Sequence, residues 1–80
     1  MALDDTEMAM LELERSWFTF AATKDEAIAE RFGMTATAYY QALNALIDRP
    51  DAMTADPLTV RRLVRMRDRR RAQRASRRVV

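Results

Sequence analysis

The chain has 80 residues, with 14 Lys or Arg, 12 Asp or Glu, one glycine, no cysteine and no histidine. A chain this short forms at most one domain and buries only about 60% of its unfolded surface, so a sizeable catalytic cleft is not expected. The absence of cysteine and histidine excludes disulfides, zinc sites and His-based catalysis. A single glycine excludes a glycine-rich phosphate loop. Binding without a cofactor, metal or small-molecule substrate is therefore the expected activity.

Charge is divided unevenly along the chain. Residues 1–50 have four basic against nine acidic residues, a net charge of −5, whereas residues 51–80 have ten arginines against three aspartates, a net charge of +7. The positive charge that can attract a polyanion therefore lies in the last third of the chain. No apolar run approaches the roughly 18 residues of a membrane span, and we expect a cytosolic protein without membrane contact.

The first predicted helix begins after Asp4 or Asp5, since either aspartate can cap it. Its apolar residues cover one broad arc that should face the core: Met10, Leu11, Leu13, Trp17, Phe18 and Ala21. Glu14 falls in the middle of this arc, where an unpaired carboxylate is costly. We expect an arginine or a set of backbone donors to pair with it, in a structural role.

The second predicted helix starts at a capping box formed by Thr23 and Glu26. An inward stripe is expected from Ile28, Ala29 and Phe32, and Gly33 can take the left-handed conformation that ends a helix.

A third predicted helix is capped by Thr35 or Thr37 and runs until Pro50 stops it. With Asp25 as the first position, residues 25–44 match the helix-turn-helix pattern, because Ala29 provides the small residue at the helix contact and Gly33 the turn. The packed positions of this pattern are apolar or aromatic: Ile28, Phe32, Met34, Tyr39 and Ala42.

The face of the third helix opposite its apolar stripe is polar. Together with the helix start, it gives five candidate base-reading residues: Thr35, Thr37, Tyr40, Gln41 and Asn44. In a major groove, Gln and Asn can bond adenine bidentately and Thr can contact a thymine methyl. The alternative is an ordinary solvated face, and it gains weight because no Lys or Arg occurs between Arg31 and Arg49.

The fourth predicted helix starts at Asp56 and Pro57, a capping residue followed by proline at the first helical position. Apolar contact is expected only in its first turns, from five residues: Leu58, Val60, Leu63, Val64 and Met66. Four arginines share one face and are the candidate phosphate contacts: Arg61, Arg62, Arg65 and Arg69. We thus expect a bundle over residues 1–66 and a basic extension over 67–80, which is either a disordered solubilising tail or an arm that becomes helical on a polyanion or an acidic protein.

Several strings of the sequence together resemble one known family. They are Glu14-Arg15-x-Trp17, Ala27-Ile28-x-Glu30-Arg31-Phe32-Gly33, Tyr39-Tyr40-Gln41-x-Leu43-Asn44-x-Leu46-Ile47-Asp48 and Asp56-Pro57. Over residues 8–75 the chain is similar to short actinobacterial proteins catalogued as a domain of unknown function, with a basic C-terminal end. The resemblance implies an actinobacterial cytosolic setting and a helix-turn-helix similar to the DNA-binding region of sigma factors. Phe18 stands where a second tryptophan is frequent, and Ala38 where an arginine is frequent, which removes a backbone contact.

The sequence therefore predicts an all-α, non-enzymatic small helical bundle that binds nucleic acid, most readily duplex DNA, as a transcriptional regulator or nucleoid-associated accessory. One alternative is a protein-interaction module that docks on RNA polymerase or another acidic partner of the transcription machinery. Another is binding to structured RNA or the ribosome through the arginines alone. If Arg61, Arg62 and Arg65 flank Thr37 and Gln41 and form one continuous surface with them, DNA binding is favoured. If they lie on the far side, the two alternatives are favoured.

Overall fold

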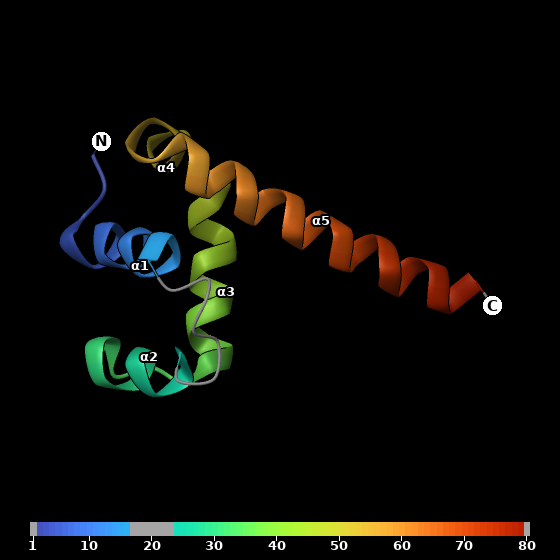
Figure 1. Ribbon diagram of the computed structural model, residues 1–80, viewed down its shortest axis with the longest axis horizontal. Helices are drawn as coiled ribbons and strands as arrows, with labels where there is room; N and C mark the ends of the chain where they lie inside the picture. The colour runs from blue at the N-terminus through green and yellow to red at the C-terminus, as the bar shows by residue number, and fades with distance from the viewer. Residues whose placement is uncertain (1, 17–23, 80) are drawn as a thin grey trace.

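The computed structural model describes residues 2–16 and 24–79, with side chains up to residue 75. This part of the chain contains helices and no strand, which confirms the all-α prediction (Figure 1). The helices are α1 (Asp5–Ser16), α2 (Lys24–Phe32), α3 (Ala36–Ile47), α4 (Pro50–Ala55) and α5 (Pro57–Val79).

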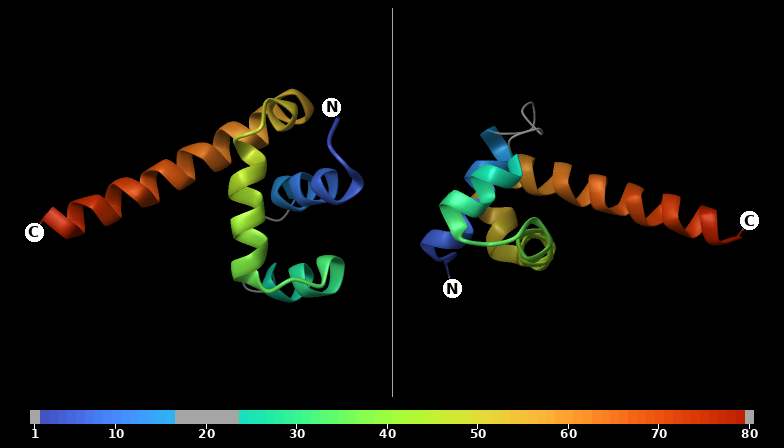
Figure 2. Two further views of the ribbon diagram at one scale, coloured as in Figure 1. Left: turned by 180° about the vertical axis from the view of Figure 1, so that it is seen from behind. Right: turned by 90° about the horizontal axis from the view of Figure 1, so that it is seen from below.

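Helix α3 is the centre of the arrangement. In Figure 1 and in both views of Figure 2, α1 and α2 lie on one side of α3. Helix α5 crosses the C-terminal end of α3 and extends away on the other side. The last turns of α5 project well beyond the other helices, and the molecule is correspondingly elongated, 43 Å along its longest axis. The predicted boundary at residue 67 lies inside this continuous helix.

Helices α2 and α3 are joined by the short turn at 33–35, as the sequence predicts. Gly33 has φ of 62°, the left-handed conformation that glycine adopts at no steric cost, and its amide donates to the Ala29 carbonyl at 2.9 Å. Thr35 then caps α3, since its hydroxyl accepts from the Ala38 amide at 3.2 Å. The view along α3 in Figure 2 shows α2 lying across it. Ala29 does not provide the small residue at the helix contact, because it is exposed.

Helix α1 starts as predicted, with Asp4 as the cap. The Glu7 amide donates to the Asp4 carboxylate at 2.7 Å, and the Asp4 amide donates to the Glu7 carboxylate at 2.9 Å. Met10, Leu11 and Leu13 are buried as expected. The other expected core residues of this segment, and the second helix's cap, lie outside the described residues: Trp17, Phe18, Ala21 and Thr23.

Two local predictions are wrong. Ala29 is exposed instead of inward-facing, because α2 buries Ala27 and Ile28, and a turn of about 100° per residue carries the next position off that stripe. The third helix ends at Ile47 instead of reaching Pro50, and Pro50 begins the short helix α4, where its missing amide hydrogen costs nothing.

The core joins α1, α2, α3, α4 and the first turns of α5. Its buried apolar residues are Met10, Leu11, Leu13, Ala27, Ile28, Tyr39, Leu43, Leu46, Ile47, Ala52, Val60 and Leu63. Asp56 caps α5 through the Thr59 amide at 3.3 Å, as the sequence indicates. Two of the apolar contacts expected for α5 are wrong, since Leu58 is 78% exposed and Met66 is 41% exposed.

Candidate nucleic-acid interface

The open face of α3 carries uncharged polar side chains, two exposed alanines, Ala38 and Ala45, and at its C-terminal end the exposed Asp48. Thr37, Gln41 and Asn44 are exposed, while the opposite side of the helix buries Tyr39, Leu43 and Leu46, in line with the 3.6-residue period of a helix. Three of the predicted base-reading residues therefore do share one solvent face. They offer amide and hydroxyl groups, which can make directional hydrogen bonds to base edges.

The other two predicted base-reading residues have structural contacts. Thr35 is exposed, but its hydroxyl caps α3. Tyr40 is half-buried at the edge of the open face: its ring packs edge-to-face on Tyr39 at 5.2 Å, and the Lys24 ammonium lies 5.1 Å from the ring centroid. Tyr40 thus borders the open face and does not project from it.

The four arginines predicted to contact phosphate divide into two groups. Arg61, Arg65 and Arg69 are exposed, on the side of α5 opposite the buried Val60 and Leu63, and so they point away from α3. Arg62 is half-buried, and its guanidinium donates to the Glu14 carbonyl at 2.5 Å. The structure therefore does not bring these arginines together with Thr37 and Gln41, and Arg62 links α5 to α1. By the criterion set from the sequence, this placement favours the protein-interaction and RNA-binding alternatives, and a DNA interface has to use other arginines.

Different arginines meet α3. The Arg67 guanidinium donates to the Asn44 carbonyl at 3.3 Å and to the Asp48 carboxylate at 2.8 Å. One turn further along, Arg70 is exposed and lines a shallow pocket between the two helices together with Tyr40, Asn44 and Met66. The sequence contains the signal for this contact, because residues 67, 70 and 74 continue the helical stripe that begins at Val60 and Leu63.

Below this surface, a buried carboxylate ties the helices together. Glu14 is 3% exposed; one of its oxygens accepts from the Lys24 ammonium at 2.7 Å and the other from the Tyr39 hydroxyl at 2.6 Å. Burial, followed by the hydrogen bond to Glu14, raises the pKa of Tyr39 far above its usual value, so its hydroxyl stays a donor. The sequence predicts an arginine or backbone donors as partners of this carboxylate. The structure instead places a lysine and a tyrosine on its oxygens, while Arg62 donates to the Glu14 main-chain carbonyl.

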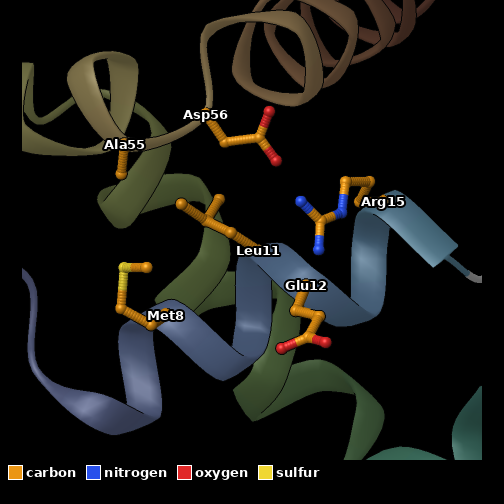
Figure 3. A pocket seen from close by; sticks show the side chains of 6 residues that line it. All are labelled: Met8, Leu11, Glu12, Arg15, Ala55 and Asp56. Atoms are coloured by element: carbon orange, nitrogen blue, oxygen red, sulfur yellow. The ribbon is translucent and has the colours of Figure 1, made fainter.

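A second pocket lies between α1 and the α4–α5 junction. Its volume is about 100 Å³. Figure 3 shows Met8 and Leu11 of α1 facing Ala55 and Asp56 at the α4–α5 junction, with Arg15 near Asp56; Glu12 also lines the pocket. A drug-sized ligand needs roughly 300–1,000 Å³, so this pocket holds a small group at most.

Two structural features are absent from the described residues. No helix there is long and apolar enough to cross a membrane. Within the same ranges, 2–16 and 24–79, no group of Asp and Glu side chains is arranged to hold a metal ion.

Comparison with known families decides the chain's relationship. A family model described as "Protein of unknown function (DUF3263)" matches residues 2–75. The chain belongs to this family. The resemblance to a family of unknown function is thereby confirmed. Among curated proteins and among solved structures, none matches the chain. The family description assigns no activity.

Proposed function

We propose that this protein binds duplex DNA, with the open face of α3 in the major groove and the α3-facing arginines of α5 on the phosphate backbone. The observation that carries the proposal is the exposure of residues 68–75 of α5, which we call the arm. Beyond Arg67 its described side chains are all exposed, and they include Arg69, Arg70, Arg71 and Arg74, none of which pairs with an acid in the described part of the chain. Arginine forks match phosphate oxygens bidentately, and such contacts supply most of the affinity for DNA.

The placement of this arm distinguishes it from a solubilising tail. Arg70 lines the same pocket as Asn44, so the phosphate-binding side chains start where the open face of α3 ends. Figures 1 and 2 show α5 leaving on the side of α3 away from α1 and α2. A duplex held against Thr37, Gln41 and Asn44 therefore has its backbone within reach of Arg70 and Arg74.

The exposed acidic residues of α2 favour the same orientation, whereas Asp48 and Asp68 near the arm are paired with Arg67. Helix α2 exposes Asp25, Glu26 and Glu30, all on the opposite side of α3 from the arm. Phosphate is repelled from α2 and attracted to α5, which orients the protein before contact. Because the N-terminal turn of α2 is acidic, we propose that the contacts to the DNA phosphate backbone come from α5. A helix-turn-helix similar to that of sigma factors and a place on an actinobacterial nucleoid form part of the same proposal.

Two variants test the division of labour. Arg70→Gln/Arg71→Gln/Arg74→Gln should weaken binding to every duplex and make the plot of log affinity against log salt shallower by about 0.9 for each phosphate that the variant no longer neutralises. Gln41→Ala/Asn44→Ala should leave that slope nearly intact and reduce discrimination between a selected and a scrambled duplex by about 1–3 kcal/mol for each bidentate hydrogen-bonded pair removed. The measurement is fluorescence anisotropy over a salt series, with duplexes obtained by selection from a random pool.

The outcomes separate the rival functions. Failure to bind any duplex at low salt would falsify the proposal. Binding without preference for any selected duplex would remove the role of α3 and leave an arginine-driven nonspecific binder. Tighter binding to a structured RNA than to any duplex would replace DNA as the ligand, and capture of RNA polymerase in the presence of nuclease would favour the interaction module.

A further inference from the structure

The outer side of α5 carries a second arginine stripe. Arg61, Arg65 and Arg69 are spaced four residues apart, which places them in one row at about 6 Å intervals along the helix. All three are exposed, and none is paired with an acidic side chain among residues 2–16 and 24–75. We define these three residues as the outer stripe. Asp68 lies next to it, but its carboxylate pairs with Arg67 at 3.6 Å.

The outer stripe points away from the proposed duplex. At about 100° per residue, Arg61 lies directly across the helix from Arg70, and Arg65 directly across from Arg74. Arg70 is on the α3 side, because it lines the pocket with Asn44. A helix with its side chains is about 10–12 Å thick, so a duplex seated on α3 leaves the guanidinium groups of the outer stripe in solvent.

We infer that the outer stripe binds the phosphate backbone of a second duplex, so that one molecule bridges two DNA segments. This inference rests on the proposed function, since the first duplex occupies the α3 side. Charge complementarity favours the second duplex as the occupant: the stripe has three unpaired guanidinium groups, and among its exposed neighbours Leu58 is large and apolar and Ala72 is small. A protein interface takes its stability from a desolvated apolar or aromatic centre, which this side of α5 does not provide in its described residues.

Two variants of equal charge test the inference. Arg61→Gln/Arg65→Gln/Arg69→Gln removes the outer stripe, and Arg70→Gln/Arg71→Gln/Arg74→Gln removes three arginines from the α3 side. Single-duplex affinity is measured by anisotropy with the protein in excess. Bridging is measured as recovery of a dye-labelled duplex on beads that carry a second, biotinylated duplex. The outer-stripe variant should lose about tenfold or more in bridging while its single-duplex affinity falls by only about two- to threefold. The α3-side variant should lose bridging in proportion to its weaker single-duplex affinity.

Separate readings distinguish failure of this inference from failure of DNA binding. No binding to any duplex overturns both proposals. Single-duplex binding without bridging by the wild type overturns only the second. Bridging that persists in the outer-stripe variant also overturns the second proposal. A dimer with one duplex bound to each copy would give this result, and light scattering of the free protein detects such a dimer. If the outer-stripe variant loses single-duplex binding and the α3-side variant keeps it, one duplex sits on the outer stripe and there is no bridge. Unchanged thermal midpoints verify that both variants fold.

Discussion

The first and last turns of α5 are continuous in the helix but are stabilised by different forces. In the first turns, Thr59, Val60 and Leu63 are buried, and Asp56 caps the helix. From Asp68 to Ala75 every side chain is exposed, so this part depends mainly on helix propensity, which arginine, alanine and glutamine favour. The body of the protein therefore fixes the direction of the arm, whereas the arm supplies charge and contributes little to the stability of the body.

The largest effect on stability should come from a change in the body of the protein, that is, α1 to α4 and the first turns of α5. Leu13 is fully buried, and Leu13→Ala should lower the free energy of unfolding by about 2–5 kcal/mol, because the core around it collapses only partly into the cavity. Leu58→Ala is the matched control in α5, where the side chain is 78% exposed and the change should stay within about 0.5 kcal/mol. Urea denaturation followed by circular dichroism measures both, and equal losses would contradict the distinction between body and outer face.

The buried carboxylate gives the second effect. Tyr39→Phe removes the hydroxyl that donates to Glu14 at 2.6 Å and leaves a buried oxygen without that donor, which should cost about 1–3 kcal/mol of unfolding free energy. Tyr40→Phe is the control, because its hydroxyl makes no hydrogen bond to the described residues and its ring contacts persist. Chemical denaturation of the two variants side by side checks this. Similar stabilities of the two would mean that the Tyr39 hydroxyl does not support Glu14.

A substitution in the turn between α2 and α3 should have a smaller effect on stability. Gly33 has φ of 62°, and nothing lies within 4 Å of the position that a Cβ would take, so a substitution there meets backbone strain without a steric clash. Gly33→Ala should therefore cost about 1–2 kcal/mol, and Gly33→Asn less, because asparagine tolerates the left-handed conformation better. Thermal unfolding compares them. If alanine and asparagine were equally harmless, the conformation of the turn would not require glycine.

The sequence predicts the parts of the fold that depend on neighbouring residues. The cap at Asp4, the turn at Gly33, the cap at Thr35 and the start at Asp56 are correct, because each needs only a residue type and a few adjacent positions. Helix α4 is missed, since a six-residue segment shows no periodicity to detect.

The predicted interface is less accurate because it depends on how two helices pack. Thr37, Gln41 and Asn44 share the open face as expected, since one helix determines their directions. The arginines that meet α3 depend instead on which side of α5 faces the core, and a sequence with ten arginines after residue 50 offers several candidate faces. The partners of Glu14 are similarly distant, 10 and 25 residues away along the chain, and no local pattern indicates them.

The smallest effect concerns the helical structure of the arm itself. Arginines four residues apart, such as Arg65 with Arg69 and Arg70 with Arg74, repel each other and destabilise an isolated helix by about 0.2–0.5 kcal/mol per pair. Sodium chloride screens this repulsion, so far-UV circular dichroism of the wild type should show more helix at high salt than at low salt. Arg70→Gln/Arg71→Gln/Arg74→Gln should start with more helix at low salt and respond less. Arg15→Gln, a charge removed from the body, serves as the control and should respond as the wild type does. An identical salt response in all three proteins would show that the arm is held by contacts to the body, and that its charge and its helical structure are independent.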